Sequence, residues 1–561
     1  MKKISITFLV AGLLFVSAIQ AQSIQDGVKD LYAERYKSAK AAFEKLLASN
    51  PNNIEATYWL GQTHIAMEDT AGAKKVYEKA LLASANAPLV IVGMGQVELM
   101  QNKVSEARQR FETAITMTKG RKGNDPVILN AVGRAITETY SDKKKIGDIN
   151  FAIQKLEEAS QEKIKEESLL ADIYLNLGNA YRKAKPGESG GLAYQNYQKS
   201  IDADPTFPVP HYRMAQLFNS QRNWDLFEKH LKDAIAKDPR YAPAYYDLYY
   251  LKLGDFAVAE QYAKKYIESS DPDPQNDYLR VQILWAKKDF DGAITGAKNI
   301  ISQAGANTKP IVYKLIADSY LQKKDTGAAK EYVDQYFSKV KPEKVTALDY
   351  KLKADIYSAI PGQEDVVFNS YLEGVDADTI MENKIDLLKK GAEFFKSKGQ
   401  REKEGDLLAK LVQIKPNPTI NDRFYAGVAY YFGGAYPKSY AIFDTVLQKN
   451  PDEIYGYEWK FNNAKLIDTT KQDSIAVPDA LKLLAFTEKD TVKYKKQYIS
   501  AVSFLAIYYA NKAGDKEKAI EYLKKWQNMD PVNKDAIQKN IDILSKAMIR
   551  EKESASKSTG S

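Results

Sequence analysis

The sequence predicts an all-α protein, a solenoid of stacked antiparallel helix pairs. Two observations favour this fold class. A fixed ladder of small, aromatic, aliphatic and proline residues recurs along most of the 561 residues, and no alternating strand pattern of useful length interrupts it. The ladder is clearest between Arg423 and Pro451, where its members are Gly427, Tyr430, Ser439, Phe443, Val446 and Pro451.

Each member of the ladder has a packing role. Gly427 and Ser439 lack bulk, so two antiparallel helices can cross at about 8–10 Å, and Phe443 fills the space beside the crossing. The two glycines at 433–434 supply the turn, because glycine adopts positive φ at little cost. Pro451 cannot continue the second helix, since it lacks an N–H. One pair cannot bury its apolar faces alone, so we expect neighbouring pairs to stack.

This ladder resembles the tetratricopeptide repeat (TPR), a helix–turn–helix unit of about 34 residues. The resemblance implies a right-handed superhelical solenoid in which each helix pair packs on the next. Between residues 24 and 531 about 14 units follow the pattern, and about ten of them follow it closely.

The first nine units run from Ile24 to about Pro342. The small and aromatic residues that mark the first three are Gly27, Ala39, Phe43, Gly61, Ala73, Tyr77, Gly95, Ala107 and Phe111. The fourth unit has Gly133 and a longer exposed turn, and the fifth has Gly178 and Tyr197. Proline steps close many units, and Pro205 to Pro239 is one 34-residue period.

The ladder is less regular in the second half of the chain. From 343 to 416 the helical period continues but the small residues lose their places, and 452–492 is the least regular stretch. The unit beginning at Arg423 and a last unit ending at Pro531 restore the pattern. Beyond it an apolar stripe at i, i+4, i+7 and i+11 predicts a capping helix, with Ile537, Ile541, Leu544 and Met548 as its members.

We therefore expect five segments. They are a signal peptide at 1–21, an N-terminal TPR solenoid at 22–342, a C-terminal TPR-like solenoid with degenerate repeats at 343–531, a capping helix at 532–550 and a disordered tail at 551–561.

The first 21 residues have the composition of a secretory signal. Lys2 and Lys3 precede an apolar run from Ile4 to Val16, and Ala21 suits a signal peptidase. The run is shorter than the roughly 20 residues of a membrane span, and no later run approaches that length. We expect an exported protein without a transmembrane segment; the alternative is that the apolar run remains as an anchor.

Charge and cysteine content exclude several classes of function. The net charge of +8 is spread over 561 residues, which is a mild bias and not the concentrated basic patch of a nucleic-acid-binding protein. The chain has no cysteine, so disulfides, thiolate metal sites, a cysteine nucleophile and a lipoprotein anchor are excluded.

Several apparent catalytic or metal motifs lack the context that their chemistry requires. Residues 187–191 match G-x-S-x-G, but a helix and not a strand is expected before them. Asp271, Asp273 and Asp277 lack the closing glutamate of a calcium loop. The three histidines, His64, His211 and His230, show no close metal-ligand spacing, so structural roles are expected for each. We expect no catalytic residue, no cofactor and no metal.

The resemblance implies that ligands contact a concave groove lined by the first helix of each pair. The positions in the fifth, sixth, seventh and twelfth units that would face this groove are Asn179, Arg182, Lys183, Tyr212, Gln216, Asn219, Tyr246, Tyr250, Phe424 and Tyr431. In the seventh unit Tyr245/Tyr249 and Tyr246/Tyr250 form two stripes, and burial of both stripes between helices is the competing interpretation. A carboxylate clamp is not supported, because Leu175 stands where it needs lysine.

The function expected from these observations is that of a non-enzymatic scaffold of the bacterial cell envelope. It would hold protein or peptide partners in its groove, in the periplasm or at the periplasmic face of the outer membrane. The alternative is a periplasmic protein that binds glycan or cell wall, with aromatic groove residues stacking on sugar rings. The sequence indicates no nucleic-acid partner, and it leaves the partner and the oligomeric state open.

Overall fold

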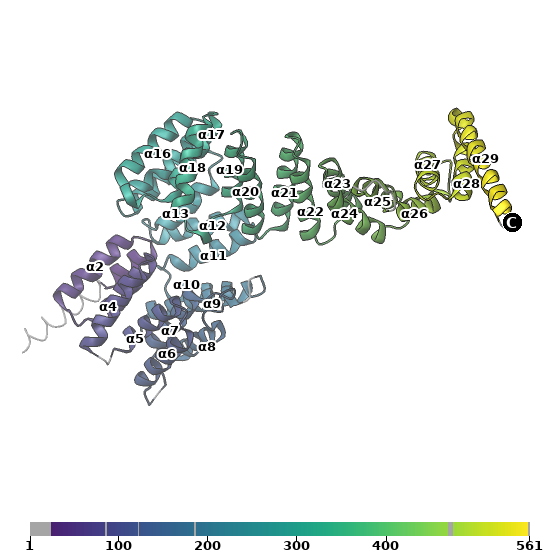
Figure 1. The fold of residues 1–561 in the computed structure, drawn as a ribbon. Coiled ribbons are helices and arrows are strands. Elements are labelled where there is room, and N and C mark those ends of the chain that lie inside the picture. The colour runs from purple at the N-terminus through teal and green to yellow at the C-terminus, as the bar shows by residue number, and fades with distance from the viewer. Residues whose placement is uncertain (1–23, 85–86, 122, 185–186, 469–474, 559–561) are drawn as a thin grey trace, which may run out of the picture. The chain divides into compact units, whose positions relative to one another are not determined.

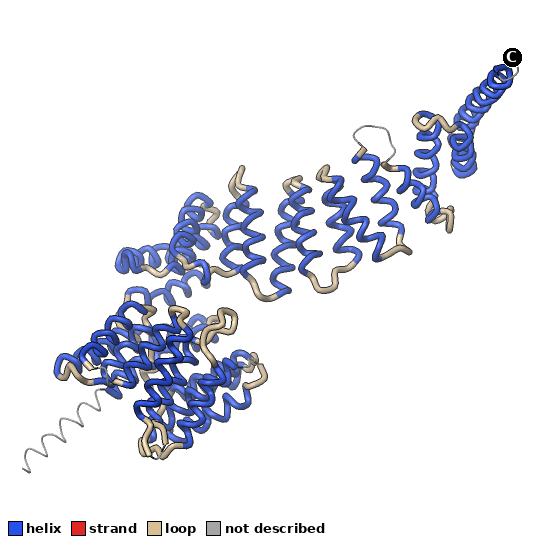
Figure 2. The backbone as a smooth tube through the Cα atoms, turned by 60° about the horizontal axis from the view of Figure 1, so that its bottom comes forward, coloured by secondary structure: helices blue, strands red, loops and turns tan. Residues whose placement is uncertain are grey.

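A computed structural model describes residues 24–84, 87–121, 123–184, 187–468 and 475–558. The signal peptide predicted at 1–21 lies outside these residues. The described chain is helical throughout, and apart from two isolated bridges, Gly120 with Gly123 and Ser141 with Ile146, it contains no β-structure (Figures 1 and 2). The predicted all-α solenoid of consecutive helix pairs is confirmed.

The chain divides into two compact units, unit 1 up to Ser319 and unit 2 from Tyr320. In unit 1 a helix over residues 24–32 pairs with α2 (Tyr36–Ser49). The helices that follow are α3 (Ile54–Ala66), α4 (Thr70–Ala83), α5 (Pro88–Met100), α6 (Val104–Thr118), α7 (Pro126–Thr139), α8 (Ile149–Gln161), α9 (Glu167–Ala184), α10 (Gly190–Ala203), α11 (Val209–Ser220), α12 (Trp224–Lys237), α13 (Ala242–Leu251), α14 (Phe256–Ser269), η1 (Pro274–Asp277), α15 (Tyr278–Ala286), α16 (Phe290–Ala304), η2 (Gly305–Asn307) and α17 (Pro310–Gln322).

The boundary between the units falls inside α17, whereas the sequence predicted a change of solenoid at residue 342. The helices of unit 2 after α17 are α18 (Thr326–Lys339), η3 (Pro342–Lys344), α19 (Ala347–Ser358), α20 (Glu364–Ala377), α21 (Met381–Ser397), α22 (Arg401–Ile414), α23 (Ile420–Phe432), α24 (Tyr436–Lys449), α25 (Ile454–Ile467), α26 (Val477–Thr487), α27 (Lys495–Asn511), α28 (Lys516–Met529), η4 (Pro531–Asn533) and α29 (Lys534–Ser558). Within the described residues the α-helices make fourteen pairs and a final helix.

A glycine on the first helix of many pairs faces a large side chain 16 residues later. A Cβ added to Gly61 would lie 2.1 Å from the ring of Tyr77, and one added to Gly427 would lie 2.5 Å from Phe443. Contacts this short leave no room for a methyl group, so glycine is required for the close approach of the two helices. The packing role that the sequence predicted for Gly427 is the one observed.

Residues 343–416, where the repeat pattern is less regular, keep this contact between a glycine and a large side chain, but the large side chain differs. A Cβ added to Gly391 would lie 2.9 Å from Leu407, which is again 16 residues later. Leucine replaces the aromatic ring, so the helix crossing persists although the aromatic residue that marks it in the sequence is lost.

In many repeats the turn between the two helices contains a residue in the left-handed region. In the first three repeats this residue is Glu34, Glu68 or Asn102, at φ of 61°, 60° and 61° and at intervals of 34 residues. In the twelfth repeat it is Gly434, at φ of 77°. A non-glycine residue in this conformation costs roughly 1–2 kcal/mol, and the packing of the two helices offsets that cost in the early repeats.

The final helix is longer than predicted. α29 packs on α28 through Ile537 and Ile541, as expected for a cap, but it continues to Ser558. Residues 551–558 are therefore helical, where the sequence predicted a disordered tail. The stretch contains no glycine or proline to end the helix, and Lys516 of α28 forms an ion pair with Glu551. Residues 559–561 lie outside the described chain.

The first repeat of unit 1 packs back onto the fifth, sixth and seventh repeats. Tyr32 donates a hydrogen bond to Asp172 of α9 at 2.5 Å, and its ring meets Phe207 edge to face at a centroid distance of 5.6 Å. Arg35 donates to the carbonyl oxygen of Arg240 at 2.6 Å. Unit 1 thus closes on itself, as the approach of the purple and teal helices within this unit shows in Figure 1.

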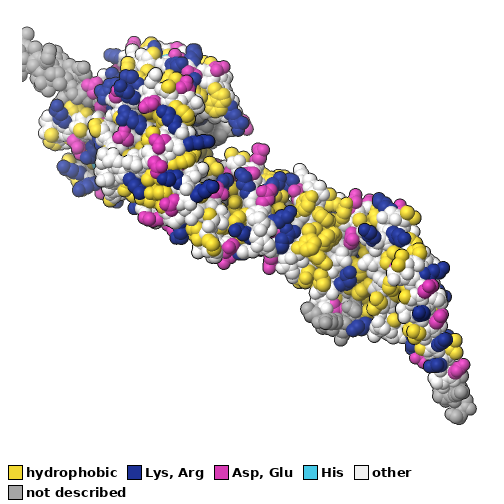
Figure 3. Space-filling model, turned by 90° about the horizontal axis from the view of Figure 1, so that it is seen from above, with side chains coloured by type: hydrophobic (Ala, Val, Ile, Leu, Met, Phe, Trp, Pro, Cys, Tyr) yellow, Lys and Arg dark blue, Asp and Glu magenta, His cyan; other side chains and the backbone are white. Residues whose placement is uncertain are grey.

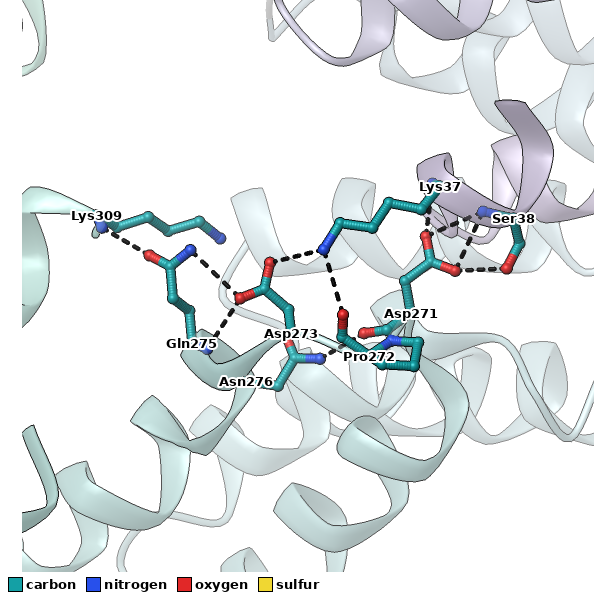
Figure 4. Close-up of polar contacts among 8 residues, drawn as sticks. All are labelled: Lys37, Ser38, Asp271, Pro272, Asp273, Gln275, Asn276 and Lys309. Atoms are coloured by element: carbon teal, nitrogen blue, oxygen red, sulfur yellow. Dashed lines mark hydrogen bonds and ion pairs between the residues drawn. The ribbon is translucent and has the colours of Figure 1, made fainter. Parts of the chain in front are cut away.

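A polar contact that we call the clasp completes this closure, and it consists of Lys37, Ser38, Asp271 and Asp273 (Figure 4). The Asp271 carboxylate accepts bonds from the backbone N–H of Lys37 at 2.7 Å and from the hydroxyl of Ser38 at 2.5 Å. Lys37 Nζ lies 3.3 Å from Asp273. Arg35, the N-cap residue of α2, makes no side-chain cap bond. Asp271 therefore caps α2 from 234 residues away along the chain.

None of the helices within the described ranges combines the length and the apolar composition that crossing a bilayer requires.

Candidate functional site

First helices of successive repeats surround a cavity of ≈ 650 Å³ in unit 1. We call it the N-terminal cavity. Its walls come from the helix over residues 24–32 and from α3, α5, α7 and α9, and the segment before α11 closes it. The residues that its chemistry depends on are Tyr32, Tyr58, Trp59, Asn130, Arg134 and Asp172. The closure of unit 1 builds this cavity, because Tyr32 and Phe207 both line it.

A buried network organises the polar wall of the N-terminal cavity. The Asp172 carboxylate forms a short ion pair with the Arg134 guanidinium and accepts a hydrogen bond from Asn130 Nδ2 at 2.6 Å. Asn176 Nδ2 donates to the same oxygen at 3.2 Å. Burial opposes the charge of Arg134, but the Asp172 carboxylate together with Tyr32, Tyr58 and Glu138 outweighs it, so the pKa of Arg134 is raised well above its usual range. Arg134 is therefore cationic at every working pH.

The aromatic wall of the cavity lies against this network. The Arg134 guanidinium carbon is 4.7 Å from the centroid of the Trp59 ring, within the range of a cation–π contact. The Tyr58 hydroxyl lies beside the Arg134 guanidinium, which lowers the pKa of Tyr58 against the larger raising effect of burial. Neither this hydroxyl nor Arg134 Nε has a hydrogen-bond partner of good geometry within the described residues, although buried polar atoms are normally paired.

The charges that line the cavity are mostly acidic. Lys29 and Arg134 are the two cations, and Glu55, Glu166, Asp172 and Asp204 are the four anions, which gives a formal lining charge of +2 − 4 = −2. The protein around Glu55 reduces its solvation and raises its pKa, and the neighbouring Glu166 carboxylate raises it further. A cation bound beside these two carboxylates would relieve their repulsion.

A second cavity of ≈ 390 Å³, the tyrosine cavity, lies between the seventh, eighth and ninth repeats of unit 1. Tyr246 and Tyr250 of α13 line it and are 39% and 38% exposed, whereas Tyr245 and Tyr249 are buried. The two stripes of α13 thus differ, with one in the core and the other on a cavity wall. The rings of Tyr246 and Tyr250 meet edge to face at 4.9 Å.

The predicted groove residues of the fifth repeat contact neighbouring repeats. Asn179 accepts a hydrogen bond from the Tyr197 hydroxyl at 2.9 Å within its own repeat. Arg182 donates to the carbonyl of Gln216 at 3.4 Å, and Lys183 donates to the carbonyl of Thr137 at 2.6 Å. Lys183 therefore binds the end of α7. None of these three lines either cavity, and their contact with a ligand stays a prediction.

Two of the sixth-repeat candidates surround a buried carboxylate. Gln216 donates to Asp247 of α13 at 2.5 Å, and Tyr212 also hydrogen-bonds to it. Burial raises the pKa of Asp247 to about 6, against the lowering effect of these two bonds. The third candidate, Asn219, lines a shallow pocket with Trp224 and Tyr250.

Phe424 and Tyr431 lie in an aromatic surface of unit 2 around Trp459. The centroid of Trp459 is 5.9 Å from that of Phe424 and 5.0 Å from that of Tyr431, both edge to face. The neighbouring rings of Tyr425 and Phe432 are 60% and 63% exposed. We call these five residues the aromatic surface. The structure thus divides the ten predicted residues among separate places in units 1 and 2.

Sequence reasoning missed the network around Arg134 although a signal for it was present. Arg134 directly follows Gly133, as the predicted residue Asn179 directly follows Gly178. The same offset from the small residue, applied to the fourth repeat, would have found Arg134. The loop at 187–191 precedes α10 and follows the helix α9, so the context of a catalytic serine elbow is not present there.

Comparison with known proteins agrees with the helix pairs and the crossings described above. Residues 30–90 match the family model for the tetratricopeptide repeat. This part of the chain therefore consists of tetratricopeptide repeats. The TPR fold generally supports protein–protein interaction scaffolds, and TPR proteins are typically not catalytic. No curated protein matches the chain.

Solved structures similar to this TPR protein include three repeat proteins. The C-terminal part of a TPR repeat-containing protein from Cytophaga hutchinsonii is 26% identical, and the match covers 46% of this chain and 98% of that chain with a TM-score of 0.26. A tetratricopeptide repeat protein from Parabacteroides merdae is 19% identical over 47% and 98%, with a TM-score of 0.30. The APC/C hetero-tetramer Cut9-Hcn1 is 13% identical over 94% and 98%, with a TM-score of 0.37.

Proposed function

We propose that this TPR protein is a non-enzymatic scaffold that holds a segment of a protein partner in the N-terminal cavity of unit 1. The observation that carries the proposal is the conjunction of a cavity of ≈ 650 Å³ with incompletely paired polar side chains in its wall. A small rotation of the Tyr58 or Arg134 side chain would let it bond to backbone carbonyls or carboxamides of an extended or helical segment. Trp59 supplies the flat apolar contact that commonly anchors such segments.

The lining charge defines the chemistry of the partner segment. Four anions against two cations favour a segment with at least one lysine or arginine among apolar side chains. Glu55 and Glu166 are the contacts expected for that cation, because each raises the energy of the other's charge. Basic and acidic side chains are interspersed over the face shown in Figure 3, which supports recognition in a local cavity over attraction by a broad charged patch.

We further propose that the protein acts in the bacterial cell envelope, in the periplasm or at the periplasmic face of the outer membrane. The support is the signal-like composition of residues 1–21. We keep two further predictions as part of this proposal. The first is that residues 22–342 and 343–531 form two solenoids, and the second is that the predicted groove residues contact a ligand.

A second candidate function, glycan binding, is favoured by one observation. Tyr425 and Phe432 are 60% and 63% exposed on the aromatic surface, and exposed rings provide the apolar faces on which sugars stack. This function would use unit 2 and would leave the N-terminal cavity without a role.

The test is in-cell crosslinking of the tagged full-length protein, followed by affinity capture from the envelope fraction and mass spectrometry. The cavity variant is the charge reversal Glu55→Lys with Glu166→Lys. Its matched control is Glu44→Lys with Glu78→Lys, which makes the same change in net charge at exposed sites on the second helices α2 and α4. Binding of the partner segment is then measured by fluorescence anisotropy.

We expect one or two dominant protein partners, and a loss of affinity of at least about tenfold in the cavity variant only, from the loss of one charge-assisted contact. Equal affinity in the cavity variant and the control would contradict the use of this cavity. Saturable binding on a sugar array, lost in Phe432→Ala and without an enriched protein, would instead establish the second candidate.

A further inference from the structure

The two helices of the sixth repeat bring two histidines and an aspartate together. His211 lies in the first turn of α11, and His230 and Asp233 lie on α12 at i and i+3, which places them on one face. The ring centroids of His211 and His230 are 5.9 Å apart. One potential ligand atom from each of the three side chains lies within 4.8 Å of the other two.

Three ring nitrogens in this cluster make no hydrogen bond to a described residue. Both nitrogens of His211 and Nδ1 of His230 are buried without a hydrogen bond to any described residue. His230 is only 7% exposed. Leaving a buried donor or acceptor unpaired is costly, and three such atoms in one cluster require an explanation. The remaining histidine differs, because His64 Nδ1 pairs with Asp69 at 2.8 Å.

Packing accounts for only part of this arrangement. Phe218 stacks on His230 with a centroid distance of 5.4 Å and an interplanar angle of 6°. The stack holds the plane of the imidazole but offers no partner to Nδ1. The structural roles that the sequence predicted for His211 and His230 therefore leave their nitrogens unexplained.

The spacing suits a divalent metal ion. His230 Nδ1 is 3.7 Å from Asp233 Oδ2, and two ligands about 2.0–2.1 Å from a tetrahedral Zn²⁺ are about 3.4 Å apart. A histidine binds such an ion through the lone pair of an unprotonated ring nitrogen.

We propose that His211, His230 and Asp233 bind Zn²⁺ and thereby join the two helices of the sixth repeat. Two imidazoles and a carboxylate are a donor set that zinc accepts, with water as the fourth ligand. The chain has no cysteine, and its only other histidine is His64. The site is separate from the N-terminal cavity, so it does not depend on the proposed function.

The test uses the full mature chain, treated with a chelator and then dialysed. Zn²⁺ binding is measured by isothermal titration calorimetry, and Co²⁺ is used as a visible-absorption probe of four-coordinate geometry. The variants are Asp233→Asn, which changes a half-buried side chain and keeps its size, and His211→Gln. The matched control is His64→Gln, and circular dichroism checks the folding of each chain.

We expect one Zn²⁺ per chain, a Co²⁺ spectrum of four-coordinate type, and a rise in Tm on adding Zn²⁺. Asp233→Asn and His211→Gln should each weaken binding by at least about tenfold, while His64→Gln should not. The proposal is wrong if the wild-type chain binds no Zn²⁺ at micromolar concentrations. It is equally wrong if binding survives in both site variants or is lost in His64→Gln.

Discussion

At the residue scale, burial of the Asp247 carboxylate makes the stability of the folded protein depend on pH. Its carboxylate accepts a hydrogen bond from Gln216 at 2.5 Å, yet burial raises its pKa to about 6. In an unfolded chain an aspartate titrates near pH 3.9. The folded protein therefore binds this proton more tightly, and the associated stability is present below about pH 4 and is lost as the pH rises through 6.

We expect Asp247→Asn to stabilise the protein above pH 6 by about 1–2 kcal/mol, below the limit of about 3 kcal/mol that two pKa units allow. Asparagine keeps an oxygen that can accept the Gln216 bond and carries no charge. Near pH 4 the variant and the wild type should be equally stable. Urea unfolding at both pH values measures this, with the exposed Asp225→Asn as a charge-matched control. A gain that is the same at both pH values would contradict the assignment.

At the element scale, the second helix of the first repeat depends on a residue from the end of the seventh. Asp271 accepts bonds from the first turn of α2, where Arg35 provides no side-chain cap. A carboxylate at a helix N-terminus also interacts favourably with the helix dipole. The clasp therefore stabilises one helix and closes unit 1 with the same contact.

Asp271→Ala should destabilise unit 1 by about 1 kcal/mol, the usual effect of removing a helix cap. The loss should be local, with faster amide hydrogen exchange at residues 36–39. Asp277→Ala removes the same charge a few residues away, from an exposed pair with Arg280, and should have little effect. Equal exchange at 36–39 in both variants would show that Asp271 does not cap α2.

The helix pairs could be predicted from the sequence, whereas the closure could not. Gly61 and Tyr77 define a crossing through local spacing, and the repeat pattern carries that information in every clear unit. The meeting of Ser38 with Asp271 depends on the small rotation from each repeat to the next, summed over several repeats. The sequence pattern of a single repeat does not give the total rotation over several repeats.

The residues of the candidate site could likewise be predicted only in part from the sequence. Tyr246 and Tyr250 could be named from their stripe on one helix, and they line the tyrosine cavity. The pairing of Arg134 with Asp172 joins different repeats, and so does the bond from Tyr32 to Asp172. These contacts follow from the stacking and the closure, so they could not be derived from any single repeat.

At the scale of the whole molecule, the two ends of the described chain differ. A linear solenoid usually opens most easily at its terminal repeats, because each has only one neighbour. α2 packs on α3 and is also held by the clasp, whereas α29 packs on α28 and on the short helix η4 that directly precedes it.

Hydrogen exchange measured by mass spectrometry should therefore be asymmetric. We expect residues 36–49 to exchange about as slowly as α4 and α6, and residues 534–558 to exchange at least about tenfold faster. Exchange of 36–49 as fast as that of 534–558 would mean that the first repeat frays like an ordinary end.

The closure of unit 1 has a kinetic consequence for the proposed function. Tyr32 and Phe207, from the two parts that meet when the unit closes, both line the N-terminal cavity. If a partner segment binds there, parting Lys37 and Ser38 from Asp271 would separate the two parts of its binding site. The residence time of that segment would then depend on the opening rate of unit 1, and the clasp could change it without contacting the segment.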